Sequence, residues 1–110
     1  MIKETIMKME LLIKDAKKMD PKRKIDLEAL IKELKIELDD LSKNKQEDAD
    51  SIAGFATVAV HEALRESKDE ALIELSTSGL QSSVRKIAAS HPKLTAIVRN
   101  ISRSLSNLGI

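Results

Sequence analysis

Apolar residues recur at steps of three and four along almost the whole chain, and this spacing is the strongest constraint on its fold. In an α-helix such residues share one face, whereas a half-buried β-strand requires strict alternation. The residue types that favour strands are scarce, and the 110 residues include only three Gly, two Pro and a single aromatic residue, Phe55. We therefore predict an all-α protein of about five amphipathic helices.

The first two predicted helices form an antiparallel hairpin, one over about residues 2–18 and the other over about residues 21–43. Between them lies Asp20-Pro21, where Asp is a good N-cap and Pro is tolerated at the first helical position. The apolar stripes of both helices resemble the seam of a coiled coil. The stripe residues are Ile6, Met9 and Ile13 in the first helix, and Leu27, Ile31, Leu34 and Leu38 in the second.

A polar stretch at residues 42–51 follows the hairpin and is the best candidate for a hinge. We therefore divide the chain into an N-terminal hairpin, residues 1–45, and a C-terminal helical segment, residues 46–110, which together form one domain. Three helices are expected in the second part, over about residues 48–66, 68–89 and 92–108.

The third and fourth predicted helices have unusual features. The third carries many small residues, so another helix can approach closely, and the interior Gly54 costs about 1 kcal/mol relative to Ala. That cost suggests either tight packing at Gly54 or a break just after Ser51. In the fourth helix the segment 76–79 is expected to kink or frame the helix. Its expected buried residues are Leu72, Leu75, Leu80, Val84 and Ile87.

The hairpin stripes also predict self-association. Two such helices bury only one side of each, and doubling the hairpin into a four-helix arrangement would complete a core. A chain of this length is close to the size at which oligomerisation often supplies missing core. We therefore predict a non-enzymatic interaction or structural protein that forms a homo-oligomer, with a dimer favoured, through the seven stripe residues.

No motif for catalysis, a cofactor or a metal is apparent. The segment 61–65, His-Glu-Ala-Leu-Arg, is close to the H-E-x-x-H zinc motif, but Arg65 occupies the position of the second histidine and cannot ligate zinc. Cysteine is absent, and so are a P-loop, a nucleophile elbow and a glycine-rich nucleotide-binding motif. We expect no catalytic, cofactor or metal site.

The C-terminal third is basic, because the last acidic residue is Glu74 although the net charge is only +1. Three interpretations remain open: an outer face balanced by acids of the same or a neighbouring subunit, a docking surface for an acidic partner, or a nucleic-acid or membrane contact. Dispersed cations without aromatic residues disfavour nucleic acid. The alternative function is therefore a small regulatory binder that acts through Arg85, Lys86, Arg99 and Arg103.

Two further expectations concern the last helix and the location of the protein. Ser90 and His91 are expected to accept hydrogen bonds from free amides at the start of that helix, and Pro92 to fix its first position. The longest apolar run, residues 52–60, is about half of what a membrane-spanning helix needs, and the N-terminus is unlike a signal peptide. We expect a cytoplasmic protein without a transmembrane segment.

The segments Ser-His-Pro-Lys-Leu-Thr at 90–95 and Leu-Ser-Asn-Leu-Gly-Ile at 105–110 carry a family resemblance. The chain resembles a bacterial family of short helical proteins, domain of unknown function 4404, whose members tend to end in H-P-x-L-T, an amphipathic helix and N-x-G-I. Residues 51–55 and 61–68 are similar to the middle of its longer members. The resemblance covers roughly the last 60 residues and implies a helical fold but no known activity.

Overall fold

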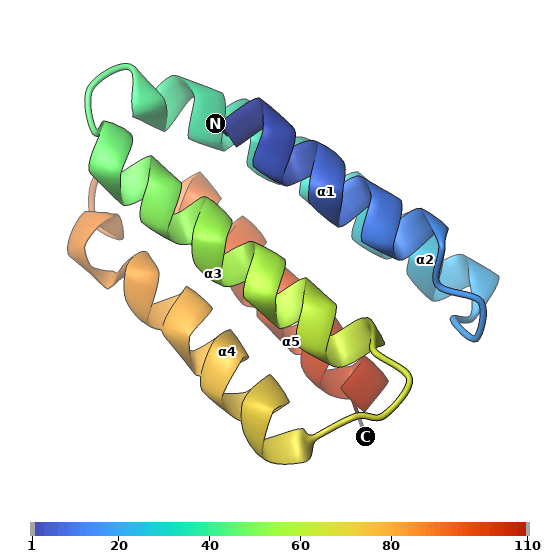
Figure 1. Ribbon diagram of the computed structural model, residues 1–110. Helices are drawn as coiled ribbons and strands as arrows, with labels where there is room; N and C mark the ends of the chain where they lie inside the picture. The colour runs from blue at the N-terminus through green and yellow to red at the C-terminus, as the bar shows by residue number, and fades with distance from the viewer. Residues whose placement is uncertain (1, 110) are drawn as a thin grey trace.

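Five α-helices and one short 3-10 helix make up the protein, seen in a computed structural model that describes residues 2–109 (Figure 1). No strand occurs in this range. The prediction of an all-α protein with five helices is therefore confirmed. The helices are α1 (Ile2–Lys14), α2 (Pro21–Ser42), α3 (Gln46–Leu64), α4 (Glu70–Ser83), η1 (Arg85–Ile87) and α5 (Pro92–Gly109).

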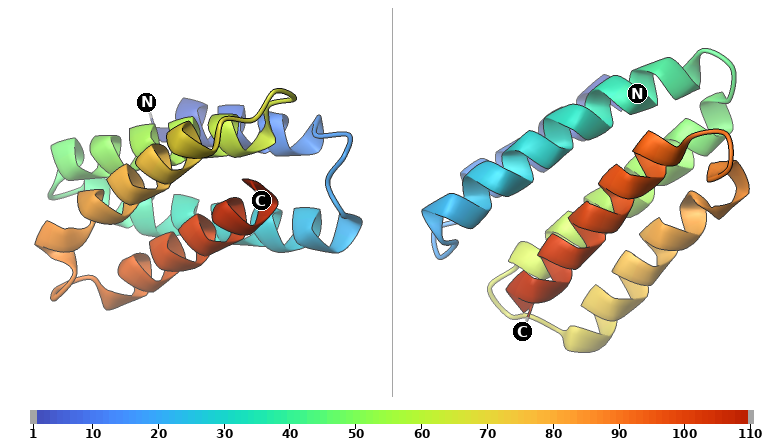
Figure 2. Two further views of the ribbon diagram at one scale, coloured as in Figure 1. Left: turned by 90° about the horizontal axis from the view of Figure 1, so that it is seen from below. Right: turned by 180° about the vertical axis from the view of Figure 1, so that it is seen from behind.

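The helices form two layers, with α1, α3 and α4 in one and α2 and α5 in the other (Figure 2). Helices α1 and α2 make the predicted antiparallel hairpin. This hairpin does not project from the molecule, because α1 and α2 both contact α3 and α2 also contacts α5. Helix α3 is the centre of the bundle, since it contacts each of the other four α-helices.

Small side chains explain why α3 can occupy this central position. Its buried face consists mainly of alanines that are at most 2% exposed, and small residues let neighbouring helices approach closely. The close approach expected from the sequence thus occurs on the alanine face of α3. These alanines are Ala49, Ala53, Ala56, Ala59 and Ala63.

One continuous apolar core joins all the helices. Helix α5 completes this core with a regular stripe that faces α2, α3 and α4. Burial of this stripe removes apolar surface from water at about 25 cal/mol per Å², which is the main stabilising term for such a bundle. The stripe residues are Leu94, Ile97, Val98, Ile101 and Leu105.

Prolines and one aspartate mark the helix starts. Helices α2 and α5 begin at Pro21 and Pro92, as predicted. Asp20 takes the N-cap position of α2, but its side chain makes no cap hydrogen bond. The carboxylate of Asp69 does cap α4, because it accepts hydrogen bonds from the amides of Ala71 at 2.9 Å and Leu72 at 3.3 Å.

One predicted hinge is shorter than expected, and one segment expected to be irregular does not break its helix. The expected hinge at 42–51 is reduced to residues 43–45, because α3 already begins at Gln46 with Glu47 and Asp48 in its first turn, where carboxylates favour a helix. The segment 76–79 does not interrupt α4 either. Ser76 and Thr77 are buried within α4, and their hydroxyls donate to the carbonyl oxygen of Ile73 at 3.1 and 2.8 Å.

Candidate interaction surface

The seven residues predicted to mediate self-association all lie in the core of the single chain. Each is at most 1% exposed, because α3 and α5 cover the side of the hairpin that was expected to contact a second copy. While the bundle is closed, a second copy cannot contact them. Any association of the folded chain has to use other residues. The seven are Ile6, Met9, Ile13, Leu27, Ile31, Leu34 and Leu38.

The four cations of the predicted basic surface are exposed and come from two different elements. Arg85 and Lys86 lie on η1, whereas Arg99 and Arg103 lie on α5. Acids of α2 accompany α5: Lys93 lies 3.8 Å from Glu37, measured from Nζ to Oε2. This arrangement is the one expected for a basic helix balanced by acids of the same chain.

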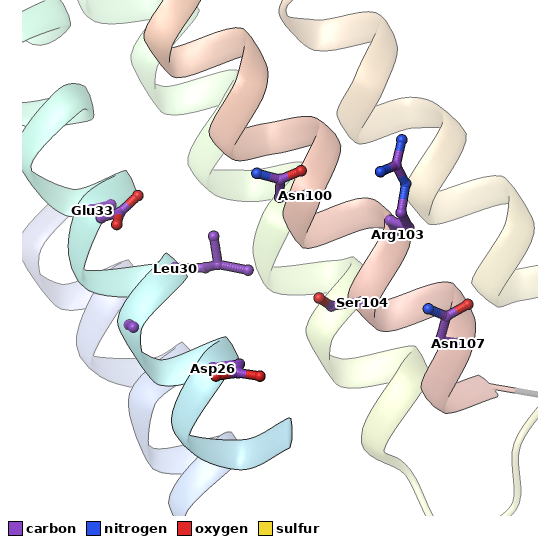
Figure 3. A pocket seen from close by; sticks show the side chains of 8 residues that line it. Asp26, Leu30, Glu33, Asn100, Arg103, Ser104 and Asn107 are labelled. Carbon is purple, nitrogen blue, oxygen red and sulfur yellow. The ribbon is translucent and has the colours of Figure 1, made fainter. Parts of the chain in front are cut away.

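A groove of about 390 Å³ lies between α2 and α5, and the Arg103 side chain at its edge extends away from α2 (Figure 3). Asp26 and Glu33 come from α2, and amide and hydroxyl groups line the α5 side. The groove contains no histidine and no residue paired as nucleophile and base. The full lining is Asp26, Ala29, Leu30, Glu33, Asn100, Arg103, Ser104 and Asn107.

A second cavity, of about 590 Å³, lies at the end of the bundle between the α1–α2 and α3–α4 connections. Its lining mixes apolar side chains such as Met19 and Leu64 with cations and acids of the loops. One cation is already engaged, since Lys68 Nζ donates to the carbonyl oxygen of Leu108 at 2.7 Å. With opposite charges interspersed around its rim, the cavity does not define a ligand of one charge.

The two histidines do not form a metal site. Within residues 2–109, no group of three or more His, Asp or Glu side chains is arranged to hold a metal ion. His61 is exposed on α3 with Glu62 beside it, 3.9 Å from Nε2 to Oε2. In the same range no helix is long and apolar enough to cross a membrane.

The Ser90-His91-Pro92 segment starts α5 through its backbone. The carbonyl oxygen of His91 accepts the amide of Thr95 at 3.1 Å and its hydroxyl at 3.0 Å. The Ser90 hydroxyl donates to the carbonyl oxygen of Ile87 at 3.2 Å and lies 2.9 Å from His91 Nδ1. The expectation that Ser90 accepts from a helix amide is thus not met.

Large apolar side chains gather on the outside of α3 and α4. Phe55 and Val58 on α3 are 44% and 50% exposed, and Leu72 and Leu75 on α4 are 38% and 70% exposed. Gly79 faces the Phe55 ring, and Leu72, Leu75 and Gly79 follow each other at steps of three and four, so they share one side of α4. We call the four residues Phe55, Val58, Leu72 and Leu75 the outer α3–α4 surface.

The prediction that Leu72 and Leu75 are core residues is wrong. Helix α4 has two apolar stripes, and the one that is buried contains Ile73 and Leu80 and continues into Ile87 of η1. Ser76 and Thr77 can join this buried stripe because their hydroxyls are satisfied within the helix. The stripe that contains Leu72 and Leu75 is left facing outward.

Three of the four residues of the outer α3–α4 surface, all except Leu72, lie in stretches of sequence without charge. Residues 51–60 and 75–84 contain no Asp, Glu, Lys, Arg or His, in a chain of which 34% is charged. On α2 the exposed apolar residues are separated by charges: Ile25 and Ile36 are three turns apart, with Asp26, Lys32 and Glu33 in between. Apolar patches of this kind mark interaction sites more often than scattered single residues do.

The two helical glycines are predicted to respond differently to alanine. No atom of the described residues beyond the adjoining helix backbone lies within 4 Å of a methyl group placed on Gly54, but one placed on Gly79 would lie 2.7 Å from Phe55 Cε1. Gly54→Ala should therefore raise the free energy of unfolding by about 1 kcal/mol. Gly79→Ala should raise the free energy of unfolding by a similar amount only in a background that already carries Phe55→Ala, where the ring that blocks the added methyl group is absent. Urea unfolding of dilute protein measures both, and equal gains in the wild-type background would contradict the predicted contact.

Comparison with known proteins identifies a family. The family model described as domain of unknown function (DUF4404) matches residues 27–110. Because this match covers more than half of the chain, the protein belongs to that family. The match begins within α2 and so extends beyond the last 60 residues that carry the resemblance in sequence. No curated protein and no solved structure matches the chain.

Proposed function

We propose that the protein is a non-enzymatic helical interaction module that self-associates through the outer α3–α4 surface. The observation that carries this proposal is the exposure of four large apolar side chains, three of which lie in charge-free stretches of a highly charged chain. Leu75, at 70% exposed, loses most by facing water, and burying a leucine gains about 1.5–3 kcal/mol.

Two findings support association through this surface rather than through the hairpin, and binding rather than catalysis. The apolar stripes of the hairpin are buried in the core of a single chain, so their burial does not require a second copy. Neither the groove nor the end cavity brings a nucleophile and a base together, which favours binding over catalysis.

A matched pair of substitutions tests the proposal. Val58→Asp places a charge in the outer α3–α4 surface and should reduce the protein to a monomer of 12.2 kDa in sedimentation experiments at micromolar concentration. Ile36→Asp is the control, because Ile36 is similarly exposed but lies on α2 in the opposite layer. The proposal fails if the wild type is monomeric, or if both variants associate as the wild type does.

The alternative function, binding of nucleic acid or an acidic partner, has its own test. Arg99→Glu together with Arg103→Glu should abolish such binding, and wild-type affinity should fall steeply with salt. The dispersed positions of the four cations and the acids beside α5 do not favour this alternative.

A further inference from the structure

We infer that the partner of the outer α3–α4 surface is a second copy of this chain, with the two α3 helices antiparallel across a two-fold axis near residue 56. This inference rests on the proposed function and specifies its geometry. It starts from the outward stripe of α3, whose members follow each other at steps of four and three and are all exposed. The α3 stripe consists of Glu47, Ser51, Gly54, Val58, His61 and Arg65.

The α3 stripe of one copy is complementary to the same stripe of a second copy that runs in the opposite direction. In an antiparallel pair centred on residue 56, Gly54 faces Val58 of the other copy, so the residue without a side chain faces an exposed apolar one. Ser51 faces His61, which brings a hydroxyl within reach of an imidazole. Glu47 faces Arg65, an opposite charge. The two-fold axis makes each of these three contacts occur twice.

Charge selects the antiparallel arrangement over the parallel one. A parallel pair of α3 helices would place Glu47 against Glu47 and Arg65 against Arg65, which is repulsive at both ends. The middle of the stripe carries no charge, so the contact there has no orientation preference of its own. Arg65 also keeps its ion pair with Glu62 of the same chain, 2.9 Å from Nη1 to Oε1, which holds the guanidinium at this end of α3.

Gly54 supplies an independent reason to expect a close partner. A glycine in the interior of a helix destabilises it relative to alanine. Within residues 2–109, nothing beyond the adjoining helix backbone occupies the space at Gly54, whereas Gly79 accommodates the Phe55 ring. A helix of a second copy packed over Gly54 would use that space, as small residues at helix crossings do.

The flanks of the outer α3–α4 surface fit the same axis. In this arrangement the two-fold axis lies between the two copies and is perpendicular to α3. Helix α4 lies beside α3 in the same layer (Figures 1 and 2). The axis therefore places α4 of one copy over α4 of the other. Leu72 and Leu75 are then covered together with Phe55 and Val58. The outward stripe of α3 forms the centre of the contact.

Charge reversal tests the pairing. Glu47→Arg alone and Arg65→Glu alone each make both end contacts repulsive, and each should weaken homodimers roughly tenfold. An equimolar mixture of the two variants should form heterodimers with wild-type affinity, because both end contacts are then attractive. Lys32→Glu and Glu33→Arg on α2 are the controls and should leave the dissociation constant unchanged.

Cysteine cross-linking tests the register in a chain that has no cysteine of its own. A mixture of Gly54→Cys and Val58→Cys should give the 54–58 disulfide under mild oxidation, identified by mass spectrometry. Homodimeric 54–54 and 58–58 disulfides should be at least tenfold slower, since four residues of helix offset those sites by about 6 Å along the axis.

The outcomes distinguish this inference from the proposed function. A wild-type monomer overturns both. A second outcome is a wild-type dimer that Val58→Asp disrupts, while the two charge variants form no heterodimer of wild-type affinity and the 54–54 disulfide forms fastest. That outcome supports the proposed function and overturns the antiparallel arrangement.

Discussion

Leu34→Ala is expected to lower the free energy of unfolding by about 2–5 kcal/mol, a large part of the stability of a domain of this size. Leu34 is 0% exposed in the middle of α2, a helix that contacts α1, α3 and α5. Removing its side chain leaves a cavity between these helices, in addition to losing the apolar burial. Urea unfolding followed by far-ultraviolet circular dichroism measures the change.

Ile36→Ala is the matched control for Leu34→Ala. Ile36 lies two residues away on α2 but is 65% exposed, so its truncation should change stability by less than about 0.5 kcal/mol. If the stripe of α2 instead served contact with a second copy, Leu34→Ala would weaken association and leave the stability of the dilute monomer unchanged. That result would contradict the closed single-chain core.

Ala56→Leu is expected to destabilise the protein by about 3 kcal/mol through overpacking. Ala56 is 0% exposed at the middle of α3, where the alanine face meets the neighbouring helices. A larger side chain there has to push helices apart or adopt a strained rotamer. Thermal and urea unfolding measure the loss.

The control for Ala56→Leu is Ala71→Leu on α4. Ala71 is exposed, so the same enlargement should stay within about 0.5 kcal/mol of the wild type. Equal stability of the two variants would contradict close packing at the alanine face of α3.

Much of the fold follows from local signals in the sequence. Steps of three and four give the helices, Pro21 and Pro92 mark two of the helix starts, and the alanines of α3 indicate close packing. The segment 76–79 was expected to kink or frame the fourth helix, but it lies inside α4, where the hydroxyls of Ser76 and Thr77 donate to the Ile73 carbonyl oxygen.

The candidate interaction surface was harder to predict, because an apolar stripe shows that a face is buried but not which helix covers it. The stripe that contains Leu34 looked equally suited to a second copy and to α3 and α5 of the same chain. In α3 the small alanines are buried, whereas Phe55 and Val58 face outward, which reverses the usual expectation from side-chain size. The interior Gly54 was the one signal of the outward stripe in the sequence.

A dilution series that records mass and helical signal together tests the central claim most directly: a chain that completes its own core and associates through its surface. The mass should fall from twice 12.2 kDa to 12.2 kDa on dilution, with the circular dichroism at 222 nm unchanged because folded monomers separate. Loss of the helical signal together with the mass would show that the core itself needs the second copy, and would contradict this account.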